Sequence, residues 1–294
     1  CLAIKDSKNL DTEIIPILGD IRDRSNLEHV FQKFSIDQIY HAAAYKHVPI
    51  VENENNISKA AENNILGTYN LANSAVKHGV NSFVMISTDK AVRPTNIMGA
   101  TKRFAEIIIQ SINSESSNTK FSMVRFGNVI NSSGSVIPLF IDQISRGGPI
   151  TVTHKNVMRY FMTIPEASNL VLQAGEMSSG GEVFILDMGE QVKIFDLARK
   201  LIHLSGRNHA DGDEVDGIEI VEVGLRPGEK MYEELLISGS ELKTENPKIY
   251  KATESFIEPK ILKPLLIELK ESISSFDNKK ILTLLSQHVE GFNR

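Results

Sequence analysis

The stretch Phe83-Val84-Met85-Ile86-Ser87-Thr88-Asp89-Lys90 decides how this sequence is interpreted. Its first four residues form a short apolar run typical of a buried strand, and polar residues follow where that strand should end. In an open α/β sheet, ligands bind in the crevice beyond the carboxyl ends of the parallel strands. We therefore expect Asp89 and Lys90 to face a pocket. Lys102 follows Met98 by four residues, so these two side chains are expected on one face of the next helix.

The composition is that of a soluble globular chain. The 294 residues are 41% hydrophobic and 23% charged with a net charge of -5, which is enough length for one large or two modest domains. This mild acidity predicts no nucleic-acid partner. The single cysteine, Cys1, excludes an internal disulfide and fits a reducing compartment. No apolar run approaches the ~18 residues of a membrane span, and residues 1–15 carry no signal-peptide pattern. We expect a soluble, cytoplasmic chain.

Strand-like and helix-like segments alternate over the first half of the sequence. We expect strands at 14–18, 38–44, 82–88 and 120–127, and helices at 25–34, 57–79, 97–113 and from Ser135. This alternation is typical of an α/β fold with a doubly wound parallel sheet. Beyond residue 148 the elements become shorter. We predict a Rossmann-like domain over 1–148, a smaller α/β substrate-binding lobe over 149–258 with some segments returning to the first domain, and a helical tail over 259–294.

A glycine-rich phosphate loop is missing from this pattern. A dinucleotide-binding sheet opens with a strand and a glycine-rich turn, yet no G-x-G-x-x-G occurs here. The first predicted strand behaves like the third strand of such a fold, and the chain begins with Cys1 rather than methionine. We expect that the first two strands and the phosphate loop are lacking, and that the fragment itself binds cofactor weakly or not at all and is inactive. The alternative is a complete α/β domain that never bound a dinucleotide.

Eight short blocks, in order along the chain, resemble one family. They are Gly19-Asp20-Ile21-Arg22-Asp23, His41-Ala42-Ala43-Ala44-Tyr45-Lys46-His47-Val48-Pro49, Asn64-Ile65-Leu66-Gly67-Thr68, Ser87-Thr88-Asp89-Lys90-Ala91-Val92, Asn96-Ile97-Met98-Gly99-Ala100-Thr101-Lys102-Arg103, Arg125-Phe126-Gly127-Asn128-Val129, Arg159-Tyr160-Phe161-Met162-Thr163 and Leu225-Arg226-Pro227-Gly228-Glu229-Lys230. Together they resemble the CapD-like polysaccharide biosynthesis proteins. These are nucleotide-sugar 4,6-dehydratases among the extended short-chain dehydrogenases. Met98 stands where the Y-x-x-x-K motif of that superfamily has tyrosine, which resembles the long, membrane-anchored branch.

The resemblance implies a reaction and roles for three side chains. A 4,6-dehydratase passes a hydride from sugar carbon 4 to NAD or NADP, eliminates water across carbons 5 and 6, and returns the hydride to carbon 6. By resemblance Asp89 is the acid and Lys90 the base of the elimination, while Lys102 binds the nicotinamide ribose. To act so, Asp89 needs a raised pKa and Lys90 a lowered one.

Met98 leaves one role without an obvious residue. A thioether cannot take the proton from the carbon 4 hydroxyl. Water linked to Lys102, Thr88, or ionised Asp89 could take over, and the sequence leaves these open. The other interpretation of Met98 is a packing methionine in a degenerate site. The branch that Met98 resembles favours retention at carbon 5.

Binding residues also carry over from the resemblance. The cofactor set is Asp20, Ile21, Ala42, Ala43, Ala44, Asn64, Ser87, Lys102 and Val129, and the substrate set is Lys46, Asn128, Arg159, Arg226 and Glu229. Each has a plainer interpretation: Asp20 as a helix N-cap, the alanines as tight packing, the arginines as surface ion pairs. His41 and His47 are expected to pack or cap. No spacing of His, Cys, Asp or Glu fits a metal site, so we predict none.

Three functions follow from these observations. The first is UDP-N-acetylglucosamine 4,6-dehydration for surface polysaccharide synthesis with NAD or NADP. The second is a nucleotide-sugar 4-epimerase, for which Asp89 and Lys90 would be unnecessary and a tyrosine expected at Met98. The third is a non-catalytic nucleotide-binding module. The resemblance also implies a homo-oligomer, held at the cytoplasmic face of the bacterial inner membrane only through a region preceding Cys1.

Overall fold

The computed structural model describes residues 12–116, 118–210, 217–235 and 241–294; Cys1 lies outside these ranges. The helices are α2 (Arg24–Lys33), α3 (Val48–Val51), α4 (Ile57–Ala61), α5 (Thr68–Lys77), α6 (Ile97–Glu115), α7 (Val136–Ser145), α8 (Ile164–Glu176), α9 (Ile194–Leu204), α10 (Pro259–Ser274) and α11 (Asn278–His288). Short helical segments are η1 (Glu54–Asn56), η2 (Glu62–Gly67) and η3 (Asp89–Ala91). The strands are β1 (Gln38–His41), β2 (Ser82–Ile86), β3 (Lys120–Arg125), β4 (Asn128–Val129), β5 (Ile150–Val152), β6 (Met158–Arg159), β7 (Phe161–Met162), β8 (Val183–Leu186), β9 (Val192–Lys193), β10 (Ile220–Glu222), β11 (Leu242–Lys243) and β12 (Ile249–Ala252).

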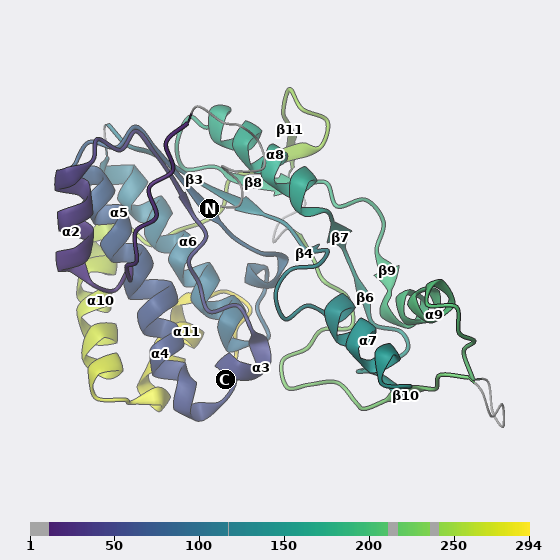
Figure 1. The fold of residues 1–294 in the computed structure, drawn as a ribbon. Helices are drawn as coiled ribbons and strands as arrows, with labels where there is room; N and C mark the ends of the chain where they lie inside the picture. The colour runs from purple at the N-terminus through teal and green to yellow at the C-terminus, as the bar shows by residue number, and fades with distance from the viewer. Residues whose placement is uncertain (1–11, 117, 211–216, 236–240) are drawn as a thin grey trace.

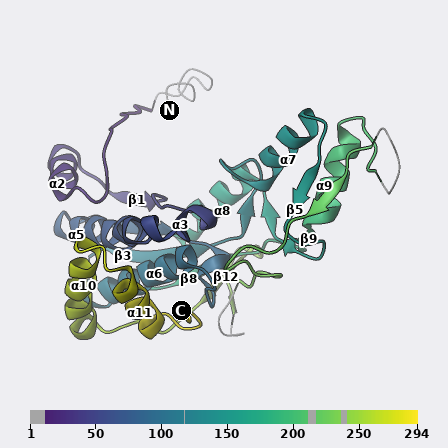
Figure 2. The ribbon, with the colours of Figure 1, turned by 90° about the horizontal axis from the view of Figure 1, so that it is seen from below.

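The main sheet has six strands in the order β1-β2-β3-β8-β12-β11. Strands β1, β2, β3 and β8 run parallel, and β12 and β11 continue the sheet antiparallel. Helices α2, α5 and α6 cover one face, and α8 covers the other (Figures 1 and 2). The predicted α/β class with a doubly wound sheet is confirmed.

Alternating apolar residues in the strands explain the two layers. Successive side chains of a strand point to opposite faces of a sheet. In β2, Phe83 and Met85 pack toward α5 and α6, whereas Val84 packs toward α8. Strand β3 repeats this with Phe121 and Met123 on the first face and Val124 on the second. Strands buried on both faces read as continuous apolar runs, as seen here.

The predicted helix over 57–79 is one helical path made of α4, η2 and α5. Its middle segment, η2, is a π-helical turn that contains Asn64, and such turns are frequent at functional sites. The path ends at Lys77, and Gly79 follows with a φ of 71°, the left-handed conformation that glycine adopts without a Cβ penalty. The C-cap residue is His78, and Gly79 directly after it turns the chain away from the helix.

The strand predicted at 14–18 does not form. This segment pairs with no strand among the described residues, and Leu18 is 98% exposed. A strand needs a hydrogen-bonded neighbour, yet β1 is the edge of the sheet and the segment does not reach it. The apolar pattern of Ile15, Ile17 and Leu18 is that of a strand, but no strand in the described part of the chain pairs with this segment.

Two further groups of elements complete the molecule. Helices α10 and α11 form a hairpin that packs on α4 and α6 around Phe104, Leu265 and Leu285. On the other side, α7, α9, β5 and β10 form a smaller lobe with its own core around Phe140 and Ile202 (Figure 1). In the described part of the chain, no helix has the length and apolar character needed to cross a membrane.

A buried ion network joins α6 to the sheet and to the segment after β12. Arg125, fully buried at the end of β3, contacts Glu106 of α6 at 2.5 Å and Glu254 at 2.6 Å. Arg103 lies 3.1 Å from both carboxylates. Glu106 also accepts a hydrogen bond of 2.6 Å from the Ser87 hydroxyl. Each charge in this network therefore has an opposite charge within contact distance.

Replacing Arg125 by methionine is expected to destabilise the fold strongly. The change leaves the Glu106 and Glu254 carboxylates buried with Arg103 as their remaining counter-charge, and breaking a buried pair costs about 3–5 kcal/mol. Urea denaturation measures the free energy of unfolding. The matched control is Arg146→Met, which removes the exposed pair with Asp142 and should cost under about 1 kcal/mol. Equal losses in both variants would contradict this account.

Candidate active site

A cavity of about 470 Å³ lies where the carboxyl ends of β1, β2 and β3 meet the smaller lobe. Its wall is built by the segments following these strands, the first turns of α6 and α7, strand β5, and the segment 226–233. The predicted residues that line it are Ala42, Ala44, Lys46, Ser87, Thr88, Lys90, Met98, Lys102, Asn128, Val129, Arg159, Arg226 and Glu229. The cavity therefore lies beyond the carboxyl ends of the parallel strands, where ligands bind in open α/β sheets.

The end of β2 positions Asp89. Thr88 caps η3 by accepting a hydrogen bond from the Lys90 amide, and its hydroxyl donates to Asp89 Oδ1 at 2.9 Å. Asp89 is fully buried, and its Oδ2 has no hydrogen-bond partner in the described part of the chain. Gly127 allows this arrangement, because a Cβ there would lie 3.2 Å from Asp89 Oδ2 and 2.9 Å from Tyr160 Cβ. One carboxylate oxygen is thus held in place and the other is left without a partner.

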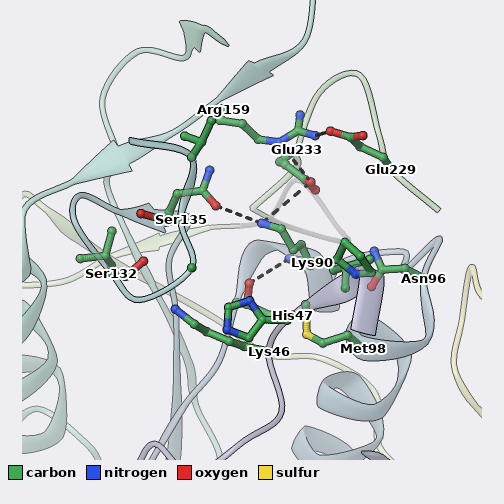
Figure 3. Close-up of a pocket in the computed structure, with 18 of the residues that line it drawn as sticks. Lys46, His47, Lys90, Asn96, Met98, Ser132, Ser135, Arg159, Glu229 and Glu233 are labelled. Atoms are coloured by element: carbon green, nitrogen blue, oxygen red, sulfur yellow. Dashed lines mark hydrogen bonds and ion pairs between the residues drawn. The ribbon is translucent and has the colours of Figure 1, made fainter. Parts of the chain in front are cut away.

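Lys90 points from η3 into the cavity (Figure 3). Its Nζ donates to Asp89 Oδ1 at 2.8 Å and to Asn128 Oδ1 at 3.3 Å. Burial disfavours the ammonium form, but the carboxylates of Asp89 and Glu233 outweigh burial and raise the pKa of Lys90. The role of a base calls for the opposite direction, so in this structure Lys90 is an ammonium.

Lys102 and Met98 share one face of α6, as the spacing predicts. The Lys102 Nζ donates to the Ile86 carbonyl oxygen at 2.7 Å, so α6 is tied to the end of β2. Burial lowers the pKa of Lys102 to about 8, while Glu106 partly opposes this shift. Met98 is 3% exposed; it belongs to the apolar core beneath α6 and also lines the cavity.

Asn64 holds the segment after β1 in place without lining the cavity. Its amide Oδ1 accepts from the Tyr45 amide at 2.7 Å, and its Nδ2 donates to the Tyr45 carbonyl at 3.1 Å and to Thr101 Oγ1 at 3.0 Å. The segment that carries Ala42, Ala44 and Lys46 is thereby fastened to α6. Ala43 is absent from the lining residues.

Asp20 and Ile21 lie away from the cavity. Asp20 contacts the Arg22 guanidinium at 2.5 Å, and these hydrogen bonds lower the pKa of Asp20 to about 2. The N-cap of α2 is Asp23, whose side chain accepts from the Ser25 and Asn26 amides, so the alternative of an N-cap at Asp20 is wrong. Ile21 packs closely against Gly67. A Cβ added to Gly67 would lie 2.7 Å from Ile21 Cδ1.

Within the substrate set, Arg159, Arg226 and Glu229 lie on the wall formed with the smaller lobe. Arg159 lies 3.1 Å from Glu229, and Glu229 also accepts from Thr153 Oγ1 at 2.9 Å and from the Arg226 amide at 3.1 Å. Arg159 is therefore paired within the cavity rather than at the surface. Lys46 and His47 lie on the opposite side in Figure 3.

The two histidines differ in position. His41 is buried, shares a hydrogen bond of 2.9 Å with Thr68 Oγ1, and has a pKa lowered to about 3 by burial and by Lys102. His41 therefore packs as a neutral side chain. His47 lines the cavity and contacts the loop at Gly134, where a Cβ would lie 2.2 Å from its Cε1. Within the described ranges, no group of three or more His, Cys, Asp or Glu could hold a metal ion.

Sequence reasoning missed Glu233, which lines the cavity close to Lys90. The local signal was weak, because Glu233 lies among the charged residues of 226–234 and no spacing relates it to Lys90. Thr153 and the serines of the loop before α7, Ser132 and Ser135, also line the cavity and carried no motif.

Comparisons with known proteins bear on the family and the fold of this chain. A family model described as "Polysaccharide biosynthesis protein" matches residues 2–254. The chain is 50% identical to the capsular polysaccharide biosynthesis protein CapD of Staphylococcus aureus, over 94% of this chain and 44% of that protein. It is 36% identical to a UDP-glucose 4-epimerase of Rickettsia canadensis, over 78% of this chain and 64% of that protein. It is 33% identical to a UDP-N-acetylglucosamine 4,6-dehydratase (inverting) of Campylobacter jejuni, over 75% and 62%.

Solved structures agree on the architecture. The structure of Pen from Bacillus thuringiensis is 32% identical with a TM-score of 0.72, covering 92% of this chain and 86% of that chain. The dTDP-glucose 4,6-dehydratase DesIV from Streptomyces venezuelae, which was solved with NAD bound, shares the fold with a TM-score of 0.66 at 21% identity, over 80% and 74%. The chain spans less than half the length of CapD. On the evidence of the matched model and these relatives, the chain belongs to the polysaccharide biosynthesis protein family.

Proposed function

We propose that this chain carries the catalytic site of an NAD(P)-dependent 4,6-dehydratase acting on a UDP-sugar, with UDP-N-acetylglucosamine as the substrate. The observation that carries the proposal is the Asp89-Lys90 pair just after the carboxyl end of β2. The two side chains are hydrogen-bonded at 2.8 Å, and Lys90 lines the cavity. Elimination of water from a sugar needs an acid for the leaving hydroxyl and a base for the carbon 5 proton. A buried carboxyl with one unpartnered oxygen and an adjacent amine can supply both.

The residues at the β1 and β2 ends fit the nicotinamide half of the cofactor. The small side chains of Ala42 and Ala44 leave room along the cavity wall, and Lys102 presents a buried amine one helical turn from Met98. Held there, NAD(P) would supply the hydride acceptor for carbon 4 and the hydride donor for carbon 6. Lys102 holds positive charge beside the reacting carbons, and Ser87 and Val129 complete the wall.

The acid-base chemistry falls to Asp89, Lys90 and Thr88. Thr88 already donates its hydroxyl proton to Asp89 Oδ1, which directs the second oxygen, Oδ2, toward proton transfer. The Met98 thioether cannot take the proton of the carbon 4 hydroxyl. We assign that proton to Asp89 in its ionised form. Its Oδ2 is buried next to Gly127 of the cavity wall and has no hydrogen-bond partner among the described residues, although Asp89 itself is not a lining residue.

The nucleotide end is assigned to the opposite wall. Arg159 and Arg226 bring guanidinium groups, which bind phosphates in bidentate fashion, and Lys46 adds a third cation at the cavity. Asn128 lines the cavity and accepts a hydrogen bond from Lys90. We further propose that the full-length protein is a homo-oligomer at the cytoplasmic face of the membrane, attached through a region outside this chain.

A nucleotide-sugar 4-epimerase is the second candidate. The 36% identity to a UDP-glucose 4-epimerase supports it. Against it stands the Asp89-Lys90 pair, for which epimerisation at carbon 4 has no use. Met98 does not separate the two reactions, because both need the proton of the carbon 4 hydroxyl to be removed. A non-catalytic nucleotide-binding module is the third candidate. Met98 favours it, because a thioether stands at the position of the catalytic tyrosine.

The product decides between these functions. A chain extended to include the expected phosphate-binding loop, incubated with UDP-N-acetylglucosamine and NAD in deuterated water, should yield a new 6-deoxy methyl signal by NMR. Asp89→Asn and Lys90→Ala should each slow its appearance on the order of 10²–10⁴-fold, because positioned acid-base groups contribute that much to rates.

The control is Asp142→Asn, which alters an exposed aspartate of α7 outside the cavity and should leave the rate unchanged. A galacto epimer without a methyl signal would replace the dehydratase by an epimerase. Cofactor binding with no change in the sugar would favour the non-catalytic module.

The burial of Lys102 predicts a pH-dependent stability. Its pKa is lowered from 10.5 to about 8, so folding carries a cost below pH 8 that disappears as pH rises toward 10.5. The parent chain should therefore gain stability relative to Lys102→Met over this range, by up to roughly 3 kcal/mol. Urea denaturation at pH 7 to 9.5 measures the difference, with Lys279→Met at an exposed position as the control. A difference that stays constant with pH would disprove this reading of Lys102.

A further inference from the structure

Glu233 is a buried carboxylate on the cavity wall whose side chain has no hydrogen bond with any residue that the structure describes. It is 5% exposed, and within the same ranges its Oε2 has no partner. Its Oε1 lies 3.9 Å from Lys90 Nζ and 3.8 Å from Arg159 Nε. Figure 3 shows the carboxylate directed at the Lys90 ammonium, on the side of Lys90 nearer to Arg159. Its backbone carbonyl is held by the Gln191 side-chain amide at 3.0 Å, which fixes the segment.

The charged groups around this pair come from several elements. Lys90 faces Asp89 on its own segment, Glu233, and Arg159 of β6. Glu233 faces Lys90, Asp89, Arg159 and Lys230. Two carboxylates therefore act on the single amine of Lys90, one hydrogen-bonded at 2.8 Å and one by charge alone at 3.9 Å.

The protonation of both partners follows from this geometry. Burial raises the pKa of Glu233, and Asp89 adds to the shift while Lys90 and Arg159 oppose it. The pKa of Lys90 is raised too, because the two carboxylates outweigh burial. The charge of Glu233 thus favours the ammonium form of Lys90, whereas the elimination assigned to Lys90 needs a free amine.

We propose that Glu233 is a positioning residue for Lys90, whose negative charge controls whether the Lys90 amine carries a proton. The inference rests on the proposed function for the role of Lys90 as a base. If the two side chains approach to hydrogen-bond distance, transfer of one proton from Lys90 Nζ to the Glu233 carboxylate gives a neutral amine and a neutral carboxylic acid. This step conserves charge and needs no further reactant.

The test measures the proton on Lys90 directly. Acetic anhydride acylates only neutral amines, and Lys90 is 18% exposed toward the cavity, so mass spectrometry can follow its labelling against pH. In Glu233→Gln we expect Lys90 to be labelled on the order of tenfold faster than in the parent at a pH below the labelling midpoint. An opposite charge within about 4–6 Å shifts a pKa by about 1–3 units, and this variant removes it.

Glu234→Gln is the matched control. It makes the same chemical change one residue away, at an exposed side chain that pairs with Arg93 at 3.1 Å and Lys230 at 3.6 Å. Its Lys90 labelling should match the parent. Unchanged labelling in Glu233→Gln, or an equal acceleration in Glu234→Gln, would overturn the proposal.

Glu233→Asp provides a second variant if Glu233→Gln does not fold by circular dichroism. The shorter side chain keeps the charge but withdraws it from Lys90, so labelling should lie above the parent rate; a rate at or below the parent's would refute the proposal. Labelling requires neither sugar nor cofactor. A failed product test therefore leaves this result standing, and unchanged labelling leaves the product test open.

Discussion

The buried ion pairs of Arg125 are the constraint on which the rest of the structure depends. Arg125 ends β3, and its partners Glu106 and Glu254 come from α6 and from the segment that leads to α10. A buried charge cannot be left unpaired, so these three elements have one arrangement that satisfies the guanidinium. Glu106 also accepts a hydrogen bond from the Ser87 hydroxyl and lies four residues beyond Lys102. Helix α6 is therefore placed with the Lys102 amine toward the end of β2, where it donates to the Ile86 carbonyl oxygen.

That placement creates a site with an unusual balance of charge. Lys102 and Lys90 are both buried amines, but burial prevails at Lys102 and lowers its pKa, whereas two carboxylates prevail at Lys90 and raise its pKa. The resemblance implied a lowered pKa for Lys90. The difference arises because Glu233 adds a second negative charge to that of Asp89. We propose that this charge controls whether the Lys90 amine carries a proton.

Local pattern was sufficient for much of the fold. Strands β1, β2 and β3 and helices α2 and α6 lie where apolar periodicity and turn residues predicted them. The segment 14–18 shows the limit of this reasoning. Its residues have strand character, but a strand exists only when a neighbour accepts its hydrogen bonds, and no local pattern reports whether that neighbour is present. The N-cap of α2 is likewise Asp23 and not Asp20, because the backbone geometry brings the Asp23 carboxylate to the first amides of the helix.

By itself the sequence determined which strands are buried on both faces, that Asp89 and Lys90 follow β2, and that Met98 and Lys102 share a helix face. These features depend on neighbours a few residues apart, whose geometry is set by the period of a helix or strand. Only the tertiary structure decided that Glu233 faces Lys90, that Arg159 pairs with Glu229 inside the cavity, and that Asn64 fastens the segment after β1 to α6. Contacts between distant segments are selected by packing and by pairing of buried charges, because both act through space and leave no periodic mark along the chain.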